Sequence, residues 1–398
     1  MRKKILIVTL NIKEEIDKKN NISYAGNSYQ LYKLLLKKFD VKIYEYNFKK
    51  NITKINNDIV NQAKKVSADI IFFLDLESKP YLLSNTINVL KESYYLVSLC
   101  MDSDLYISNN NFYNQYMDYI LTNSPSSMNS SCRDKVQYFD LGTYKSLRVR
   151  KKKFFDVAFL GTIEKANRRE YIQFLRKNKI KVHDFGKDTS NGVVTPKKYF
   201  DIINSSKICL RFSARDFKKD ISKLRQDPLT VNNKSQHIGF LDYFSCGAFL
   251  LVEKIETLKI FKQNDCFKFF RNKHDLLKKI NYYLKHSKDR NKIASNGYKI
   301  FQSFYKKNLL NKLFENLNTT KKNKNKNYQI SLKNYLYFKY CQNNFIIITL
   351  GSRKNLKSIL KDLLIILKFP YFSYFWTSKM VAKKFYQKLT NSFLFKTL

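Results

Sequence analysis

Three polar side chains follow apolar runs in the first third of the sequence, where they could take part in chemistry. Asp75, Asp102 and Asn123 each come at the end of a short hydrophobic segment or within two residues of it. In open α/β sheets, ligands lie outside the carboxyl ends of the strands, so these side chains are placed to contact a substrate. Asp102 could orient or deprotonate a substrate hydroxyl. A role for Asp102 as a helix cap explains the pattern equally well.

A further acidic residue, Asp242, lies inside an otherwise apolar segment that predicts a helix, a glycine and a strand in succession. The apolar residues of 236–246 follow helical spacing, whereas 248–252 form the continuous apolar run typical of a parallel sheet. Gly247, between them, is expected to cap the helix because glycine tolerates a positive φ. An ordinary αβ unit whose aspartate faces water would show the same pattern.

Strand-like and helix-like segments alternate along most of the chain, which predicts parallel sheets with helices on both faces. In residues 1–150 the expected strands are 4–9, 41–46, 68–75, 94–100 and 118–123, with a helix at 29–38. A basic run at 148–153 predicts a linker, and the alternation then restarts. The expected strands are now 156–161, 180–186, 207–212 and 248–252, with helices at 167–175, 236–246, 276–284 and 292–301. The sequence therefore predicts two doubly wound domains, 1–150 and 151–318, which face one another across a cleft.

The balance of charge is strongly basic. The 398 residues include 75 Lys and Arg against 32 Asp and Glu, a formal net charge of +43, which favours polyanionic partners such as nucleic acid, anionic membrane or phosphate-bearing substrates. An AT-rich coding sequence, which favours Lys, Asn, Ile, Tyr and Phe, accounts for part of this excess. The six cysteines form no Cys-x-x-Cys pair, which argues against structural zinc and for a reducing compartment. The apolar run near the start is too short for a signal-peptide core, and no run is long enough to span a bilayer.

The last part of the chain, residues 319–398, differs in composition from the rest. It begins with the low-complexity cationic stretch 319–327, which predicts a flexible tether. Beyond it, lysines alternate with dense aromatics such as those of 369–376, and Asp362 is the one acidic residue. This composition suits a helix at an anionic membrane interface. Stacking on single-stranded nucleic acid and packing on the main body are the alternatives.

The order of several short segments resembles a known family. These segments are Asp156-Val-Ala-Phe-Leu-Gly161, Asn167-Arg-Arg169, the helix–glycine–strand unit at 235–253, Phe269-Phe-Arg271 and Ala294-Ser-Asn-Gly-Tyr298. Tyr24-Ala-Gly-Asn27 and Met101-Asp-Ser-Asp104 extend the likeness into the first half. Together they resemble the glycosyltransferase group 1 domain of the CgeB type, over about residues 1 to 315. The resemblance implies a GT-B fold with two Rossmann-like domains.

The resemblance also implies roles for particular residues around a nucleotide-sugar donor. Asp242 stands where the family has a glutamate that accepts hydrogen bonds from the ribose hydroxyls. Three positions earlier the family usually has an arginine, but this chain has Gly239, so Lys234 or His237 is expected to neutralise the donor phosphates. We count His237 with Asp102 as candidate catalytic residues.

The remaining candidates for donor binding lie near the ends of predicted strands. Arg168, shortly after the strand-ending Gly161, is a second phosphate candidate, although a solvated helix face would also explain it. Gly26 would allow close approach of the backbone to the substrate, or form a plain turn. Asp102-Ser-Asp104 has the spacing of a divalent-cation site, but that metal motif belongs to the other major glycosyltransferase fold. We therefore expect no metal and no cofactor besides the donor.

These observations predict a metal-independent glycosyltransferase that moves a sugar from a nucleotide-sugar to a glycan, lipid-linked or protein acceptor in cell-surface polysaccharide synthesis. We expect a cytoplasmic protein held at the inner face of the membrane by its tail, with no nucleic-acid partner. The first alternative is a nucleic-acid-binding protein on an α/β scaffold, which the absence of a recognisable binding motif disfavours. The second is a glycosyltransferase-like protein that has lost catalysis, consistent with Asp242 and Gly239.

Overall fold

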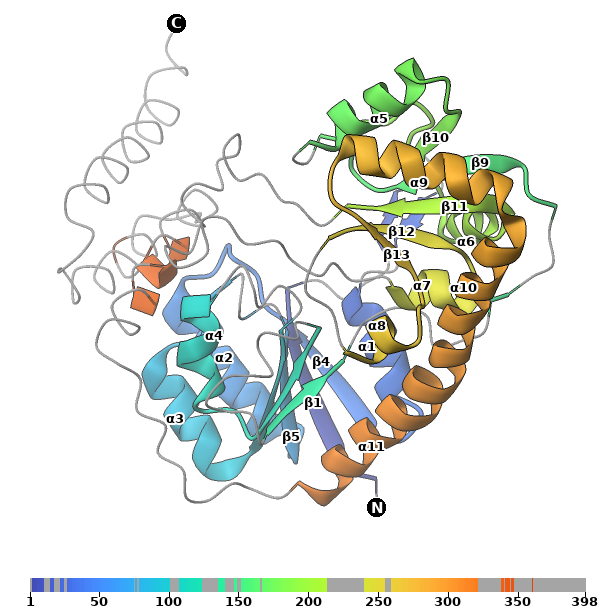
Figure 1. Ribbon diagram of the computed structural model, residues 1–398. Coiled ribbons are helices and arrows are strands. Elements are labelled where there is room, and N and C mark those ends of the chain that lie inside the picture. Colours follow the sequence, from blue (N-terminus) through green and yellow to red (C-terminus); the bar gives the residue numbers. More distant parts are fainter. Residues whose placement is uncertain are drawn as a thin grey trace, which may run out of the picture.

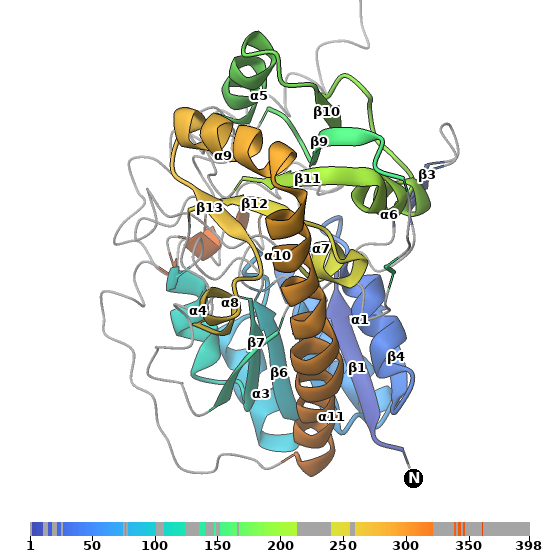
Figure 2. The ribbon, with the colours of Figure 1, turned by 45° about the vertical axis from the view of Figure 1, so that its right-hand side comes forward.

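The structure is a computed structural model of the chain. It describes residues 2–10, 15–17, 22–24, 27–74, 76, 79–100, 107–123, 135–139, 147–148, 152–164, 167–212, 240–254, 259–320, 338–339, 341–343, 345–346 and 360. These residues form two α/β domains, each built on a parallel sheet (Figure 1). A small antiparallel hairpin consists of β2 (Glu15–Asp17) and β3 (Ile22–Tyr24), of which β3 is labelled in Figure 2. The two doubly wound domains expected from the sequence are thus present.

The first domain has a six-stranded sheet in the order β4-β1-β5-β6-β7-β8. Its strands are β1 (Lys4–Thr9), β4 (Asp40–Glu45), β5 (Ile70–Leu74), β6 (Tyr95–Cys100), β7 (Tyr119–Thr122) and β8 (Val136–Tyr138). The central strands are almost entirely buried, because helices cover both faces of the sheet. These helices are α1 (Asn27–Leu35), α2 (Ile52–Lys65), α3 (Ser84–Ser93) and α4 (Ile107–Asn114).

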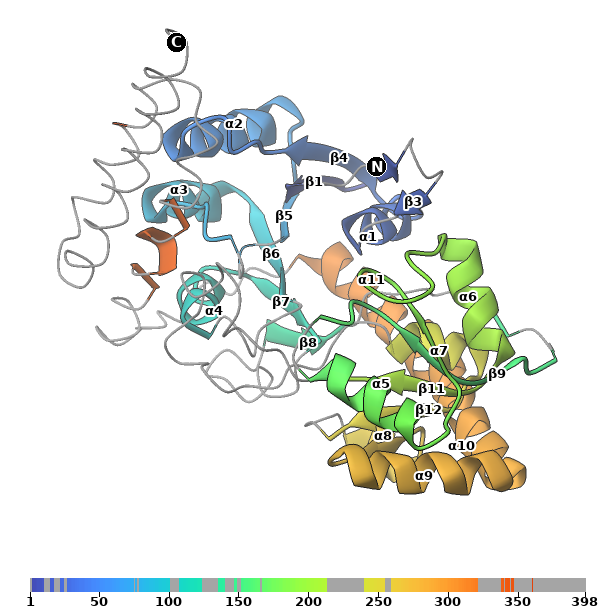
Figure 3. The same cartoon turned by 90° about the horizontal axis from the view of Figure 1, so that it is seen from above.

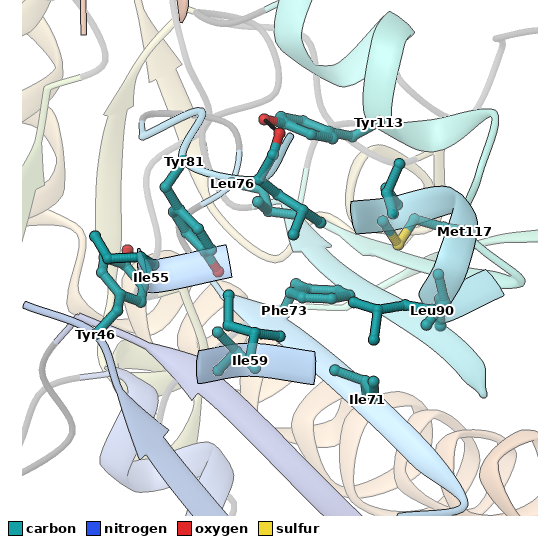
Figure 4. Packing of buried hydrophobic residues seen from close by; sticks show 14 of the residues in the cluster. Tyr46, Ile55, Ile59, Ile71, Phe73, Leu76, Tyr81, Leu90, Tyr113 and Met117 are labelled. Carbon is teal, nitrogen blue, oxygen red and sulfur yellow. Dashed lines mark hydrogen bonds between the residues drawn. The ribbon is translucent and has the colours of Figure 1, made fainter. Parts of the chain in front are cut away.

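Helix α2 shows how the sequence forms these elements, although the sequence pattern had not singled it out. Asn51 caps it, its side chain accepting from the backbone N–H of Lys54 at 2.8 Å, and Lys64 and Lys65 lie in its last turn. Apolar residues at 52, 55 and 59 form one buried face. This face packs with α3 and α4 against Ile71 and Phe73 of β5 (Figures 3 and 4).

The second domain has a five-stranded parallel sheet in the order β10-β9-β11-β12-β13. Its strands are β9 (Phe155–Leu160), β10 (Val182–Phe185), β11 (Ser206–Arg211), β12 (Leu250–Glu253) and β13 (Lys268–Phe270). One face packs on α6 (Pro196–Ser205), α7 (Phe240–Cys246) and α8 (Lys259–Gln263). The other face packs on α5 (Arg168–Lys177) and α9 (Lys273–Lys285). Figure 3 shows α6 and α9 on opposite sides of this sheet.

A nearly continuous helical segment connects the two domains. Helix α10 (Ser287–Ile300) continues through a π-helix (Phe301–Leu309) into α11 (Leu310–Thr319), which lies along the first domain (Figure 2). Phe301 and Tyr305 of the π-helix are buried in the core of the second domain. Leu313 and Leu317 of α11 are buried in the core of the first. The predicted second domain, 151–318, therefore ends in a helix whose apolar face belongs to the first domain.

Polar contacts fix α11 on the first sheet and give the direction of the strands. The side-chain amide of Asn316 donates to the Tyr119 hydroxyl at 3.0 Å. At the end of α11, Lys3 donates to the carbonyl of Asn318 and to the hydroxyl of Thr320, so the start of β1 lies beside the end of α11. Since α11 runs away from the second domain, β1 runs back toward it. The carboxyl ends of the first sheet therefore point toward the second domain (Figure 1).

The described part of the tail packs on the first domain. The ring of Phe338 stacks on Phe112 of α4, with ring centroids 3.6 Å apart. The ring of Phe345 packs edge-on against Phe48, with ring centroids 5.2 Å apart. The side-chain amide of Gln342 donates to the carbonyls of Pro80 and Leu82 at 3.2 and 3.3 Å. This segment thus follows one of the alternatives considered for the tail, packing on the main body. Among the described residues no helix has both the length and the apolar content needed to cross a membrane.

The burial of α11 makes a testable prediction. Leu313 is fully buried in the first-domain core, so Leu313→Ala should lower the free energy of unfolding by about 2–5 kcal/mol. The neighbouring Lys312 is exposed, and Lys312→Ala should change it by less than about 0.5 kcal/mol. Chemical denaturation followed by circular dichroism measures both variants. Equal effects of the two substitutions would contradict the contribution of α11 to the first-domain core.

Candidate functional site

The topology of the second sheet places a binding site between β9 and β11. These strands are neighbours, and Leu210 pairs with Phe159. The helix that follows β9, α5, lies on one face of the sheet, whereas the next described helix after β11, α7, lies on the other. Two adjacent strands whose connections leave in opposite directions form the switch point at which open α/β sheets bind ligands. The residues at this position are Gly161, after β9, and Arg211, at the end of β11.

Two glycines allow the backbone to turn tightly beside this switch point. Gly161 donates its backbone N–H to the carbonyl of Phe185 at 2.8 Å and has φ of 155°. Gly186, at the end of the neighbouring β10, has φ of 133°, and a Cβ there would lie 2.4 Å from the carbonyl oxygen of Gly161. Side chains rarely tolerate this conformation or this distance. The predicted strand-ending Gly161 thus lies at the switch point, in a turn that brings two backbone segments together.

Arg168 begins α5 and holds the turn that follows Gly161. Only 7% of the residue is exposed, and its Nη1 donates to the carbonyl of Thr162 at 2.9 Å. The same nitrogen would lie 3.9 Å from a Cβ added at Gly161. The guanidinium is therefore beside the switch point, as its predicted role in binding phosphate requires. That role itself stays a prediction, because the hydrogen bond to Thr162 also gives Arg168 a place in the turn.

An ion pair between an exposed arginine and a buried aspartate fixes the other end of α5. Arg176 contacts Asp184 of β10 at 2.6 Å and donates to the carbonyl of Val182 at 3.0 Å. Burial raises the pKa of Asp184, but hydrogen bonds from Ser190 and Arg176, together with the charge of Arg176, outweigh it, so that the pKa is lowered overall. Helix α5 is thus fastened to the edge of the sheet, and the position of Arg168 follows from it.

The helix–glycine–strand unit around Asp242 is confirmed, with a helix of 240–246 in the described residues. Gly247 has φ of 61°, its N–H donates to Phe244, and the N–H of Ala248 donates to Tyr243. This is the glycine-capped end of a helix that the sequence predicted. Asp242 lies in the first turn and is half-buried, whereas every other residue of α7 is buried. The one acidic side chain of α7 therefore lies on its partly exposed side.

Arg211, which sequence reasoning did not select, lies at the end of β11 near Tyr243 of α7. Its guanidinium carbon lies 6.0 Å from the ring centroid of Tyr243 on α7. Burial lowers the pKa of Arg211, but the nearby hydroxyls of Tyr243 and Tyr199 and the carboxylate of Asp242 outweigh this effect and raise it overall. Only one signal could have found it. Arg211 ends the predicted strand 207–212, where ligand contacts are expected.

The other predicted site residues have different outcomes. Asn123 is buried directly after β7, at the carboxyl end of the first sheet. Four of the candidate site residues lie outside the described residues, namely Gly26, Asp102, Lys234 and His237. Asp75 and Asp104 also lie outside them. Within the described ranges, no group of three or more His, Cys, Asp or Glu side chains is arranged to hold a metal ion. Of the predicted site, the structure describes Gly161 and Arg168 beside one another after β9 and Asp242 in the first turn of α7, and their roles in binding a donor stay predictions.

A comparison with known proteins finds a family that matches the second domain. The Glycosyl transferase-like family matches residues 163–309, an interval that contains Arg168, Arg211 and Asp242. No curated protein matches the chain. The expected resemblance to group 1 glycosyltransferases is thus confirmed over most of the second domain.

Solved structures share the complete two-domain fold. HepE of Anabaena, in complex with UDP-glucose, has a TM-score of 0.53 at 10% identity over 80% of this chain and 100% of HepE. A sucrose-phosphate synthase of Thermosynechococcus elongatus has a TM-score of 0.54 at 9% identity, with the same coverage of 80% and 100%. The protein therefore has the GT-B fold with two Rossmann-like domains that the sequence predicted.

The close backbone approach at the switch point can be tested. Gly186→Ala should destabilise the second domain by more than the ~1–2 kcal/mol that an L-residue ordinarily pays in a left-handed conformation, because its Cβ would overlap the carbonyl of Gly161. The control is Gly192→Ala, at φ of 65° with no neighbour within 4 Å of the added Cβ. Thermal unfolding compares the two variants. A cost at Gly186 equal to that at Gly192 would show that the contact imposes no constraint.

Proposed function

We propose that this protein is a glycosyltransferase that moves a sugar from a nucleotide-sugar donor to a hydroxyl group of an acceptor. The observation that carries the proposal is the placement of Asp242. It lies in the first turn of α7, in a helix–glycine–strand unit inside the interval matched by the Glycosyl transferase-like family. HepE, which shares the fold, was solved with UDP and with UDP-glucose. A uridine nucleotide is therefore the first donor to examine.

The transfer reaction requires groups that bind the donor, stabilise the leaving diphosphate and activate the acceptor. The bond between the sugar and the diphosphate breaks, the nucleoside diphosphate leaves, and the acceptor oxygen bonds to the sugar carbon as its proton passes to a base. Asp242 would accept hydrogen bonds from the ribose hydroxyls. Arg168, with Lys234 and His237, would stabilise the leaving diphosphate without a metal. Asp102 would orient or deprotonate the acceptor hydroxyl.

Nucleotide binding tests this proposal directly. In a thermal-shift panel of nucleoside diphosphates, at least one should raise the melting temperature. At a ligand concentration of 100 times the dissociation constant, binding adds about 2.7 kcal/mol to the free energy of unfolding. Asp242→Asn should weaken binding of that nucleotide about tenfold to a hundredfold, because a charged hydrogen-bond acceptor worth ~1.5–3 kcal/mol is lost. Titration calorimetry measures the change.

The matched control is Asp289→Asn, which alters an exposed aspartate in the first turn of α10. This variant should bind the nucleotide as the wild type does. A wild-type protein that responds to no nucleoside diphosphate, yet binds RNA tightly and in a salt-dependent manner, would overturn the glycosyltransferase proposal in favour of nucleic-acid binding. Release of nucleoside diphosphate from candidate nucleotide-sugars then separates an active enzyme from an inactive relative.

For the acceptor, we propose a glycan, lipid-linked or protein substrate in cell-surface polysaccharide synthesis at the cytoplasmic face of the membrane. The basic tail supports this location. Residues 347–398 carry one acidic residue, Asp362, among many lysines and aromatics, a composition that suits an anionic interface. The described cysteines 100, 209, 246, 266 and 341 are free thiols, which agrees with a reducing compartment.

Liposome flotation tests the membrane role of the tail. A version of the protein that ends at Ile346 keeps the segment packed on the first domain, so its fold should be intact. Full-length protein should float with anionic vesicles, whereas the shortened version should remain in the soluble fraction. Neutral vesicles and high salt should abolish flotation of the full-length protein, since the attraction is electrostatic. Equal partitioning of the two versions on anionic vesicles would remove the membrane proposal.

A further inference from the structure

Arg211, at the end of strand β11, is a basic residue at the carboxyl edge of the second sheet, where the donor is proposed to bind. Arg211 is the last residue of β11 and pairs with Val252 of β12, so it lies at the carboxyl end of the sheet beside the end of β9. The three residues before it, from Ile208 to Leu210, are fully buried, whereas Arg211 is partly exposed and its Nε is buried. The inner part of the Arg211 side chain is therefore enclosed by protein, whereas part of the residue is accessible at the surface beside the switch point.

The surroundings of Arg211 hold its guanidinium in place. Its side chain lies on the same face as Cys209, the face covered by α6 and α7. Tyr243 of α7 lies within cation–π distance, and the hydroxyl of Tyr199 of α6 is close enough to favour the charged form. A guanidinium whose orientation is fixed in this way loses little entropy when it binds an anion.

The charge of Arg211 needs an explanation beyond packing. A charge beside an apolar cluster costs free energy, and an aliphatic side chain of similar volume would pack at this position without that cost. Asp242 supplies one negative charge nearby. A diphosphate supplies two more, and the planar fork of an arginine matches phosphate oxygens in a bidentate arrangement.

We propose that Arg211 binds the diphosphate of the donor and supplies, from strand β11, a positive charge that helix α7 and the residue preceding it lack. Residue 239, immediately before α7, is glycine, and α7 itself contains no basic residue. Asp242 and Arg211 then act on adjacent parts of one ligand, the ribose and the diphosphate. This inference rests on the proposed function, because it requires that a nucleotide binds at the switch point.

The test compares a ligand that has the diphosphate with one that lacks it. Dissociation constants for UDP and uridine, or for the diphosphate and nucleoside selected by the panel, are measured by calorimetry on full-length protein. Arg211→Gln should weaken UDP binding on the order of 10- to 100-fold, the effect of losing a charge-assisted hydrogen bond. Uridine binding should change by less than about twofold, since it makes no phosphate contact.

Two further variants separate this role from a structural one. Arg290→Gln removes another arginine of the second domain, which is buried in α10 and donates to the carbonyl of Tyr283, and should leave the ratio of UDP to uridine affinity unchanged. Arg211→Lys keeps the charge but loses the planar fork, so it should lower the ratio less than Arg211→Gln does. If Arg211→Gln does not fold, the ratio of UDP to uridine affinity is measured for Arg211→Lys alone. A lower ratio supports the proposal, and an unchanged ratio overturns it.

The outcomes for Arg211 differ from those for the function as a whole. Equal losses of UDP and uridine binding in Arg211→Gln would mean that Arg211 only positions Asp242, and no loss would mean that it does not contact the ligand. Either result overturns the role of Arg211 while nucleotide binding by the wild type stands. Failure of the wild type to bind any nucleoside diphosphate would instead reject the proposed function.

Discussion

The need to cover both faces of two parallel sheets governs this structure. The strands of such sheets are apolar on both sides, and their backbone runs in one direction, so each connection must cross the sheet through a helix on one face or the other. In the second domain the connections leave β9 and β11 toward opposite faces. Two neighbouring strands whose following helices lie on opposite faces form the switch point at which open α/β sheets bind ligands. The position of the candidate site follows from burial of apolar surface, before any catalytic residue is considered.

The same requirement joins the two domains. The helical segment from α10 to α11 buries aromatic side chains in the second-domain core and leucines in the first-domain core. Tyr138 of β8, the last strand of the first sheet, is also part of the second-domain core and lies 6.3 Å from the ring of Phe261. The domains are therefore connected through shared apolar cores as well as through the linker. This connection holds the carboxyl ends of the first sheet toward the domain that contains Asp242.

Charge has different roles on the surface and inside this protein. The net charge of +43 favours association with anions in general, but it does not identify a binding site. The buried and half-buried charges are more informative, because each one must be compensated. Arg176 and Asp184 compensate one another and fasten α5, whereas Arg211 and Asp242 lie at the strand ends where a ligand would bind. Position in the fold, more than charge itself, distinguishes Arg211 and Asp242 from the pair that fastens α5.

The sequence by itself determined the elements whose signals are local. The helix, the glycine and the strand around Asp242 were predicted because helical periodicity, a residue that accepts positive φ and a continuous apolar run are each readable within a few residues. The two-domain α/β layout followed from the same alternation. The predicted site is described only in part, because Asp102, Lys234 and His237 lie outside the described residues, whereas Gly161 and Arg168 lie after β9 and Asp242 lies in the first turn of α7.

Only the tertiary structure decided which distant segments come together. No local pattern indicates that α11 packs on the first domain, or that Phe338 stacks on Phe112. Nor does any pattern place Arg211 of β11 near Tyr243 of α7, since these residues come from elements far apart in the chain. Such contacts are selected by complementary shape and burial between residues far apart in the chain. Local sequence fixes the conformation of a segment, whereas its partners are decided by the packing of the whole molecule.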